Sequence, residues 1–233
     1  GIMGGRSRWR TMPWMVVLFG IAVVPLGVIS IYFIIIQPIV IGTYCTLCLV
    51  TALGMLIMIP FSLDEIVAMG QFLLANTRRG RPFWRTFFKG DALPGGTKDD
   101  RPGFRSPLKD AYLSAVRGVN VPWSLLVSAL LGLWLMFSRV TFDTSGALAD
   151  SDHLIGALVI TVAVIAMAEV ARPLRFINLL FGLWLLAAPW VLTGGEVGGM
   201  ISTALTGLLL IGLSLPRGRR SDEHYGQWDR FIF

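Results

Sequence analysis

The chain has 233 residues, of which 55% are hydrophobic and only 15% are charged. Soluble domains carry about 25% charged residues, so this composition excludes an ordinary soluble enzyme, a disordered segment and a disulfide-stapled miniprotein. The net charge of +6 does not indicate nucleic-acid binding, because the basic residues lie in loops between apolar runs and there serve membrane topology. The composition predicts an all-α polytopic membrane protein.

A hairpin of two membrane-spanning helices is predicted near the start of the chain. No charged residue lies between Arg10 and Asp64, a run far longer than the roughly 20 residues that one helix needs to cross a bilayer. Pro38 and Gly42 mark the turn between a helix over residues 12–36 and a second over 44–61. Pro25 is expected to kink the first of them.

Residues 62–76 follow the hairpin and have apolar side chains at helical spacing with polar ones between them. This pattern predicts an amphipathic helix that lies in the membrane interface. We assign it, with the hairpin, to a first module over residues 1–80. Residues 81–120 are rich in Gly, Pro and basic residues, which indicates a cytoplasmic linker. A basic cytoplasmic tail is expected over 217–233.

Two tandem two-helix repeats are predicted over residues 121–216. Gly-Leu-Trp-Leu at 132–135 recurs at 182–185, and the segment 156–160 matches 207–211. Each unit crosses the membrane and returns, so the two should be related as parallel repeats. The expected spans of this second module are 121–138, 154–171, 174–192 and 197–215, which brings the total to about six.

The positive-inside rule orients this arrangement. With a cytoplasmic N-terminus, every Lys and Arg except Arg139 falls on the cytoplasmic side. Both termini are therefore predicted to be cytoplasmic. Cys45 and Cys48 then lie at the outer end of the second helix, on the extracytoplasmic side.

Cys45 and Cys48 form a C-x-x-C at the start of a membrane helix and are the only cysteines. The spacing lets the two sulfurs meet across one turn, and a helix N-terminus stabilises a thiolate. These features favour a redox pair. The alternatives are cysteines packed in a membrane helix or a static disulfide. No metal site is expected, because there is no second C-x-x-C and the two histidines are predicted on opposite sides of the membrane.

Around this motif, residues 31–51 resemble the last two helices of the vitamin K epoxide reductase family, and the resemblance extends over 13–61. The residues that carry it read Ile-Tyr-Phe-Ile-Ile-Ile-Gln-Pro-Ile-Val-Ile-Gly-Thr-Tyr-Cys-Thr-Leu-Cys-Leu-Val-Thr. The resemblance implies a thiol–disulfide oxidoreductase in which Cys45 exchanges electrons with a partner thiol and Cys48 faces a quinone. The bacterial members reoxidise the machinery that oxidises exported proteins. An extracytoplasmic thiol–disulfide partner, ubiquinone or menaquinone as cofactor, and the bacterial cytoplasmic (inner) membrane are thus implied.

Three polar residues near the cysteines are candidates for hydrogen bonds to the quinone oxygens: Tyr32, Gln37 and Tyr44. Interfacial anchoring is the alternative role for each of them.

The sequence departs from the family pattern in three respects. The family has a four-helix core, of which this chain matches two helices, and it has shuttle cysteines in an outer loop that this chain lacks. Many members carry an aromatic residue four positions after the second cysteine, where this chain has Ala52. The missing helices are expected either upstream of Gly1 in a longer parent chain or in a partner subunit, and the Gly-Ile-Met start favours the first.

The second module resembles the bacterial SPW membrane repeat. Residues 182–190 read Gly-Leu-Trp-Leu-Leu-Ala-Ala-Pro-Trp, with Ala188 in place of the serine. The first copy is degenerate, because Phe137-Ser138-Arg139 replaces the Pro-Trp portion. This resemblance implies a fold and no particular chemistry.

Two other classes of function stay open. One is a non-enzymatic membrane scaffold or assembly subunit with structural cysteines, and the other is a transporter, which the scarcity of intramembrane ionisable groups disfavours. Glu169 is expected to form a helix salt bridge with Arg172 at i+3. His153, beside Asp150 and Asp152, is predicted to be a solvated histidine of an outer loop.

Overall fold

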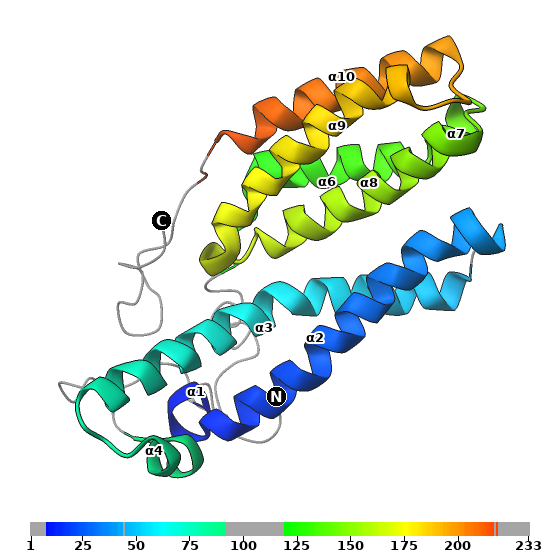
Figure 1. Ribbon diagram of the computed structural model, residues 1–233. Helices are drawn as coiled ribbons and strands as arrows, with labels where there is room; N and C mark the ends of the chain where they lie inside the picture. The colour runs from blue at the N-terminus through cyan, green and yellow to red at the C-terminus, as the bar shows by residue number, and fades with distance from the viewer. Residues whose placement is uncertain (1–7, 44, 92–118, 217, 219–233) are drawn as a thin grey trace, which may run out of the picture.

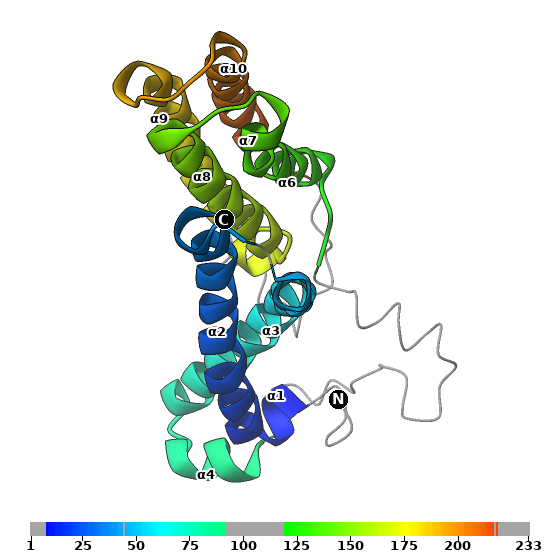
Figure 2. The ribbon, with the colours of Figure 1, turned by 90° about the vertical axis from the view of Figure 1, so that its right-hand side faces the viewer.

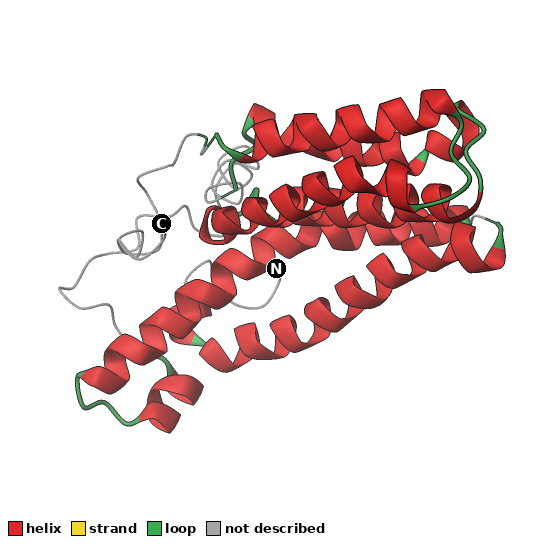
Figure 3. Ribbon diagram, turned by 45° about the horizontal axis from the view of Figure 1, so that its top comes forward, coloured by secondary structure: helices red, strands yellow, loops and turns green. Residues whose placement is uncertain are grey.

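The computed structural model describes residues 8–43, 45–91, 119–216 and 218 (Figure 1). Helices make up the regular structure of this part of the chain (Figure 3). Its one isolated β-bridge joins Val119 to Ala168. The elements are α1 (Arg8–Thr11), α2 (Pro13–Ile36), the π-helix η1 (Gln37–Ile41), α3 (Thr46–Arg78), α4 (Phe83–Lys89), α6 (Trp123–Met136), α7 (Ser138–Thr141), α8 (Gly146–Ile165), the 3-10 helix η2 (Glu169–Phe176), α9 (Ile177–Val191) and α10 (Val197–Ser214).

The helices form two groups that lie against each other. Figures 1 and 2 show the α2–α3 hairpin beside a bundle of α6, α8, α9 and α10, with α8 nearest to the hairpin. Within the described residues, five helical segments are long and apolar enough to cross a membrane, and α6 is a sixth apolar helix of 14 residues. The predicted class, an all-α membrane protein with several spans, is confirmed.

The turn of the hairpin forms where Pro38 and Gly42 predict it. Pro38 has no N–H, so the regular α-helical hydrogen-bond pattern cannot pass through it, and the chain widens into the π-helix η1. Gly42 then takes φ of 73°, a left-handed conformation that glycine adopts without steric cost. This turn returns the chain to the start of α3.

The predicted separate amphipathic helix over 62–76 is wrong. These residues are the second half of α3, which runs unbroken for 33 residues even though it contains Pro60. The apolar face of this half packs on α1 and α2 and forms a buried cluster with them, so protein rather than lipid covers it. The cluster consists of Trp9, Val16, Ala68, Met69, Phe72 and Leu73.

The two copies of the repeat are built in the same way. In the first, α6 and α8 touch at glycines, and a Cβ placed on Gly132 would lie 2.7 Å from the carbonyl oxygen of Gly156. In the second, α9 and α10 make the same contact, and a Cβ on Gly182 would lie 2.8 Å from the carbonyl oxygen of Gly207. Small residues thus let both helix pairs approach closely, as in many membrane helix pairs.

The prediction that His153 is a solvated loop residue is wrong. Helix α8 begins at Gly146 rather than near residue 154, and the side chains of Asp152 and His153 are buried, with 0% and 5% exposure. The polar run looks like a loop in the sequence because its partners are remote. Asp152 pairs with Thr203 of α10, and His153 with the backbone of α2.

At the opposite end of the bundle, Glu169 and Arg172 are both buried in η2. The Glu169 carboxylate accepts a hydrogen bond from the Asn120 side chain, and Arg172 Nε donates to the carbonyl oxygen of Ala166 at 2.8 Å. Most of the predicted linker, residues 92–118, and most of the tail, 219–233, lie outside the described residues.

Candidate functional site

The C-x-x-C lies at the start of α3 with Cys45 as the residue that caps the helix. Cys45 has an extended backbone, and its sulfur accepts a hydrogen bond from the Cys48 amide at 3.4 Å. Both cysteines are free thiols; Cys45 is exposed and Cys48 is partly exposed. The cap brings the two sulfur-bearing side chains to the same helix end, as the C-x-x-C spacing predicts.

The environment of Cys45 favours its thiolate. A hydrogen bond from the Cys48 thiol lowers the pKa of Cys45, and the backbone amides of Cys48 and Leu47 lower it further. Donors that point at a sulfur stabilise its negative charge, as at other helix N-termini. Cys45 is therefore the more readily ionised, solvent-facing member of a dithiol.

Gln37 connects the hairpin turn to the cysteine pair. Its side chain is buried, with 4% exposure, and its Oε1 accepts a hydrogen bond from the Cys45 amide at 3.0 Å. The π-helix η1 turns Gln37 inward, so the structure brings together three of the predicted site residues.

The structure does not bring the two predicted tyrosines, Tyr32 and Tyr44, together with the cysteine pair in the residues that it describes. Tyr32 lies on α2 with its side chain 56% exposed and its ring against that of Phe33, at 5.9 Å between centroids. Its neighbour Ile31 lines the cavity described next. Tyr44 lies outside the described residues.

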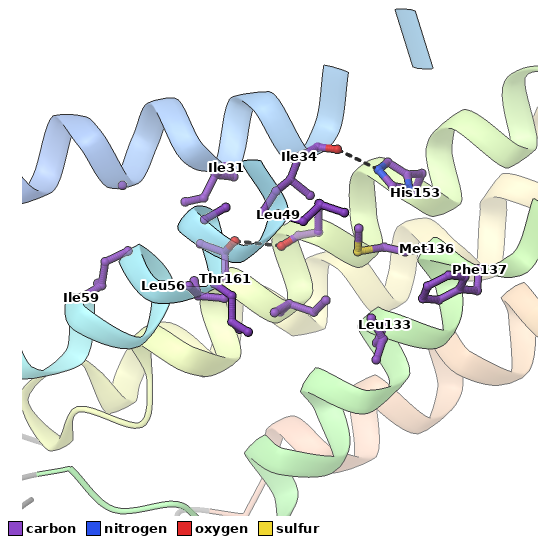
Figure 4. Close-up of a pocket in the computed structure, with 15 residues that line it drawn as sticks. Ile31, Ile34, Leu49, Leu56, Ile59, Leu133, Met136, Phe137, His153 and Thr161 are labelled. Carbon is purple, nitrogen blue, oxygen red and sulfur yellow. Dashed lines mark hydrogen bonds between the residues drawn. The ribbon is translucent and has the colours of Figure 1, made fainter. Parts of the chain in front are cut away.

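An apolar cavity of about 370 Å³ lies between the hairpin and the first copy of the repeat (Figure 4). Ala52 lines it and lies four residues after Cys48, which puts Cys48 one turn away on the same face of α3. The wall residues are Gly27, Ile31 and Ile34 of α2; Leu49, Ala52, Leu53, Leu56 and Ile59 of α3; Leu133, Met136 and Phe137 from the α6 end; and His153, Ala157, Ile160 and Thr161 of α8.

The cavity suits an apolar molecule with few polar atoms. Its volume is within the usual range for small-molecule sites, and its wall is almost wholly aliphatic and aromatic. The polar side chains of the wall are His153 and Thr161, and the Thr161 hydroxyl donates to the carbonyl oxygen of Ala157 at 2.8 Å. The small side chain of Ala52 forms part of the wall.

Sequence reasoning missed the contribution of the repeat to this site. About half of the wall comes from α6 and α8, which carry no recognisable motif for chemistry. One signal was present in the sequence. The positions of the second copy that correspond to Asp152 and His153 are Thr203 and Ala204, so the polar pair is specific to the first copy.

Comparison with known protein families supports both parts of this description. Residues 1–63 match the model of the vitamin K epoxide reductase family. Residues 122–216 match the model of the SPW repeat domain. Both resemblances are thereby confirmed, and we call these two segments the reductase segment and the SPW domain. No significant match was found among curated proteins or among solved structures.

The two walls of the cavity therefore lie in segments that match different family models. The wall residues Ile31 and Ala52 lie in the reductase segment with the cysteine pair, whereas His153 and Ala157 lie in the SPW domain.

Proposed function

We propose that the protein is a membrane thiol–disulfide oxidoreductase of vitamin K epoxide reductase type. Electrons pass from partner thiols through Cys45 and Cys48 to a quinone, either ubiquinone or menaquinone. The observation that carries this proposal is the apolar cavity of about 370 Å³ that begins one helical turn from Cys48. A structural cysteine pair would need no such cavity beside it.

The thiol chemistry starts from the oxidised pair. A partner thiolate attacks the sulfur of Cys45, and a mixed disulfide forms as the Cys45–Cys48 bond breaks and Cys48 leaves as a thiolate. A second partner thiol then attacks the mixed disulfide and releases Cys45. The partner gains a disulfide, and the pair gains two electrons and two protons.

Residues of this chain suit each role. Cys45 is exposed, so a soluble partner can reach it, and its lowered pKa makes it a good leaving group in the second exchange. Cys48 is less exposed and lies on the helix face that lines the cavity. When bound, a quinone accepts the two electrons and two protons of the dithiol. Gln37 holds the Cys45 amide and keeps the pair in register with the cavity.

The proposal includes a location and a partner class. The C-x-x-C faces the extracytoplasmic side of a bacterial cytoplasmic membrane, and the electron donor is an extracytoplasmic thiol–disulfide protein. Hydrogen bonds from Tyr32 and Tyr44 to the quinone stay predictions, which Tyr32→Phe and Tyr44→Phe test through the KM for quinone.

The decisive experiment uses the full chain in membranes with dithiothreitol as the thiol substrate and a soluble quinone as the acceptor. The proposal expects quinone-dependent oxidation of dithiothreitol, and it expects Cys48→Ser to abolish it. Thr51→Ala, an exposed change one turn along α3, is the control and should leave the rate unchanged. An unchanged rate in Cys48→Ser would overturn the proposal and favour a scaffold with structural cysteines.

A further inference from the structure

The two copies of the SPW repeat differ where the first copy meets the hairpin. The shared glycines align Gly132 with Gly182, so Arg139 corresponds to Pro189. In the second helix of each copy, His153 corresponds to Ala204. Both basic side chains of the first copy contact α2 or the turn that follows it, and the second copy has no equivalent donors at these positions.

Both contacts are made to backbone carbonyls near Pro38. In an α-helix the carbonyl of Ile34 would accept from the amide four residues later, but that residue is Pro38, which has no N–H. His153 Nε2 lies 3.1 Å from this oxygen and donates to it, because a carbonyl only accepts (Figure 4). Arg139 Nη1 donates to the carbonyl oxygen of Pro38 at 3.4 Å.

The hydrogen bond of His153 has a clear energetic reason. A backbone carbonyl without a donor is costly inside a membrane, where no water replaces the lost bond. His153 is 5% exposed, so its hydrogen bond is shielded from solvent. The first SPW copy thus supplies donors at the place where the proline breaks α2.

The same segment holds the cysteine pair. In the sequence, Gln37 lies between Ile34 and Pro38, whose carbonyl oxygens accept these two hydrogen bonds. Its Oε1 accepts a hydrogen bond from the Cys45 amide at 3.0 Å. A continuous path of hydrogen bonds and backbone therefore runs from α8, through the end of α2, to the cap of α3. His153, where this path starts on α8, also lines the cavity.

We propose that the first SPW copy is specialised as a clamp on the outer end of the hairpin, with His153 and Arg139 as positioning residues for the Cys45–Cys48 pair. This inference rests on the proposed function for its role in catalysis, but the clamp itself is tested without quinone. It gives the SPW domain a role in positioning the cysteine pair, and it offers a reason why the first copy carries Arg139 and His153 where the second has Pro189 and Ala204.

The test compares three full-length variants in membranes. His153→Leu removes the donor to Ile34, His153→Gln keeps an N–H donor, and Thr203→Val removes an equally buried hydrogen bond inside the SPW domain. Two readouts are taken from each: the pH dependence of Cys45 alkylation, measured without quinone, and the rate of quinone-dependent dithiothreitol oxidation.

For His153→Leu we expect the alkylation midpoint to move to higher pH, because a loosened cap aligns the donors to Cys45 less well. Oxidation should slow by about 10- to 100-fold, the range expected when reacting groups are misplaced by about 1 Å. His153→Gln should restore both readouts substantially, and Thr203→Val should leave both near wild type. Arg139→Met should shift both in the same direction as His153→Leu, and it serves as the second variant if His153→Leu does not fold.

Wild-type alkylation and oxidation in folded His153→Leu would overturn the clamp, as would a His153→Gln variant as defective as His153→Leu. The two proposals fail in different ways. If Cys48→Ser leaves quinone-dependent oxidation unchanged while His153→Leu still shifts Cys45 alkylation, the clamp stands and the oxidoreductase assignment falls.

Discussion

Thr203 Oγ1 donates a hydrogen bond of 2.8 Å to Asp152 Oδ2, and the two residues occupy equivalent positions in the two copies of the SPW repeat. Equivalent residues meet only near an axis that relates the copies. A second pair of contacts agrees with such an axis: Trp134 donates to Ser202, and Trp184 donates to Ser151, at 3.0 and 2.9 Å. The SPW domain is therefore a pseudo-symmetric unit, and differences between its copies are informative.

The close contact between α9 and α10 predicts that alanine substitution changes stability differently at two glycines of α10. Gly207→Ala would put a Cβ 2.7 Å from the carbonyl oxygen of Gly182, so α9 and α10 must move apart, at a cost of about 1–3 kcal/mol. Gly212→Ala meets nothing within 4 Å and should be neutral or slightly stabilising. Thermal unfolding in detergent measures both, and equal melting temperatures would contradict the contact.

The capping geometry of Cys45 predicts its reactivity with pH. Its lowered pKa means that the thiolate persists to lower pH than for an ordinary cysteine, so alkylation by iodoacetamide should have its midpoint below the usual cysteine range. Because the Cys48 thiol is the largest cause, Cys48→Ala should move that midpoint upward. Mass spectrometry of Cys45 across a pH series checks both statements, and an unshifted midpoint in Cys48→Ala would refute the assigned cause.

The cavity predicts that a larger side chain weakens quinone binding when it is placed in the first copy of the SPW repeat, but not at the equivalent position of the second. Ala157→Phe places a ring in the cavity wall and should raise the KM for quinone by tenfold or more, since it takes up ligand space. Leu208→Phe changes the equivalent residue of the second copy, which is 59% exposed, and should have no effect. Steady-state oxidation of dithiothreitol at varied quinone gives both constants, and a similar KM for the two variants would argue against the cavity as the site.

The charge distribution predicts the side on which the C-x-x-C lies. A membrane-impermeant maleimide should label Cys45 in intact spheroplasts without prior lysis, because the proposed topology puts the Cys45 end of α3 on the extracytoplasmic side. A Ser221→Cys variant in a Cys45→Ser/Cys48→Ser background is the control and should be labelled only after lysis. Reversed labelling would invert the predicted topology.

The sequence is informative wherever the controlling interaction is local. The run without charge predicts the hairpin, Pro38 and Gly42 predict its turn, and the repeated Gly-Leu-Trp-Leu predicts the paired copies. The structure of α3 could not be predicted in this way, because periodicity reveals an apolar face but not whether lipid or protein covers it.

The environment of His153 could not be predicted from its neighbours in the sequence either. Its two neighbouring acids and its position before an apolar run are typical of a loop, whereas its partner lies on another helix far away in the chain. The cavity depends on such remote packing, so its SPW wall could not be found from a motif. The cysteine pair could be found from the sequence, because the chemistry of a C-x-x-C at a helix start depends on neighbouring residues.

The length of α3 has a consequence for where the two substrates meet. A helix of 33 residues is about 50 Å long, and even at the steepest usual tilt of about 40° it still rises roughly 38 Å, more than the hydrocarbon thickness of about 30 Å. At least one of its ends therefore reaches a headgroup layer. The exposed rings of Trp84 and Phe88 in α4 suit such a layer. In the proposed reaction, Cys45 at the far end lies at the aqueous boundary and the cavity lies within the hydrocarbon layer, so a water-soluble thiol and a lipid-soluble oxidant would approach the same pair of sulfurs from different phases.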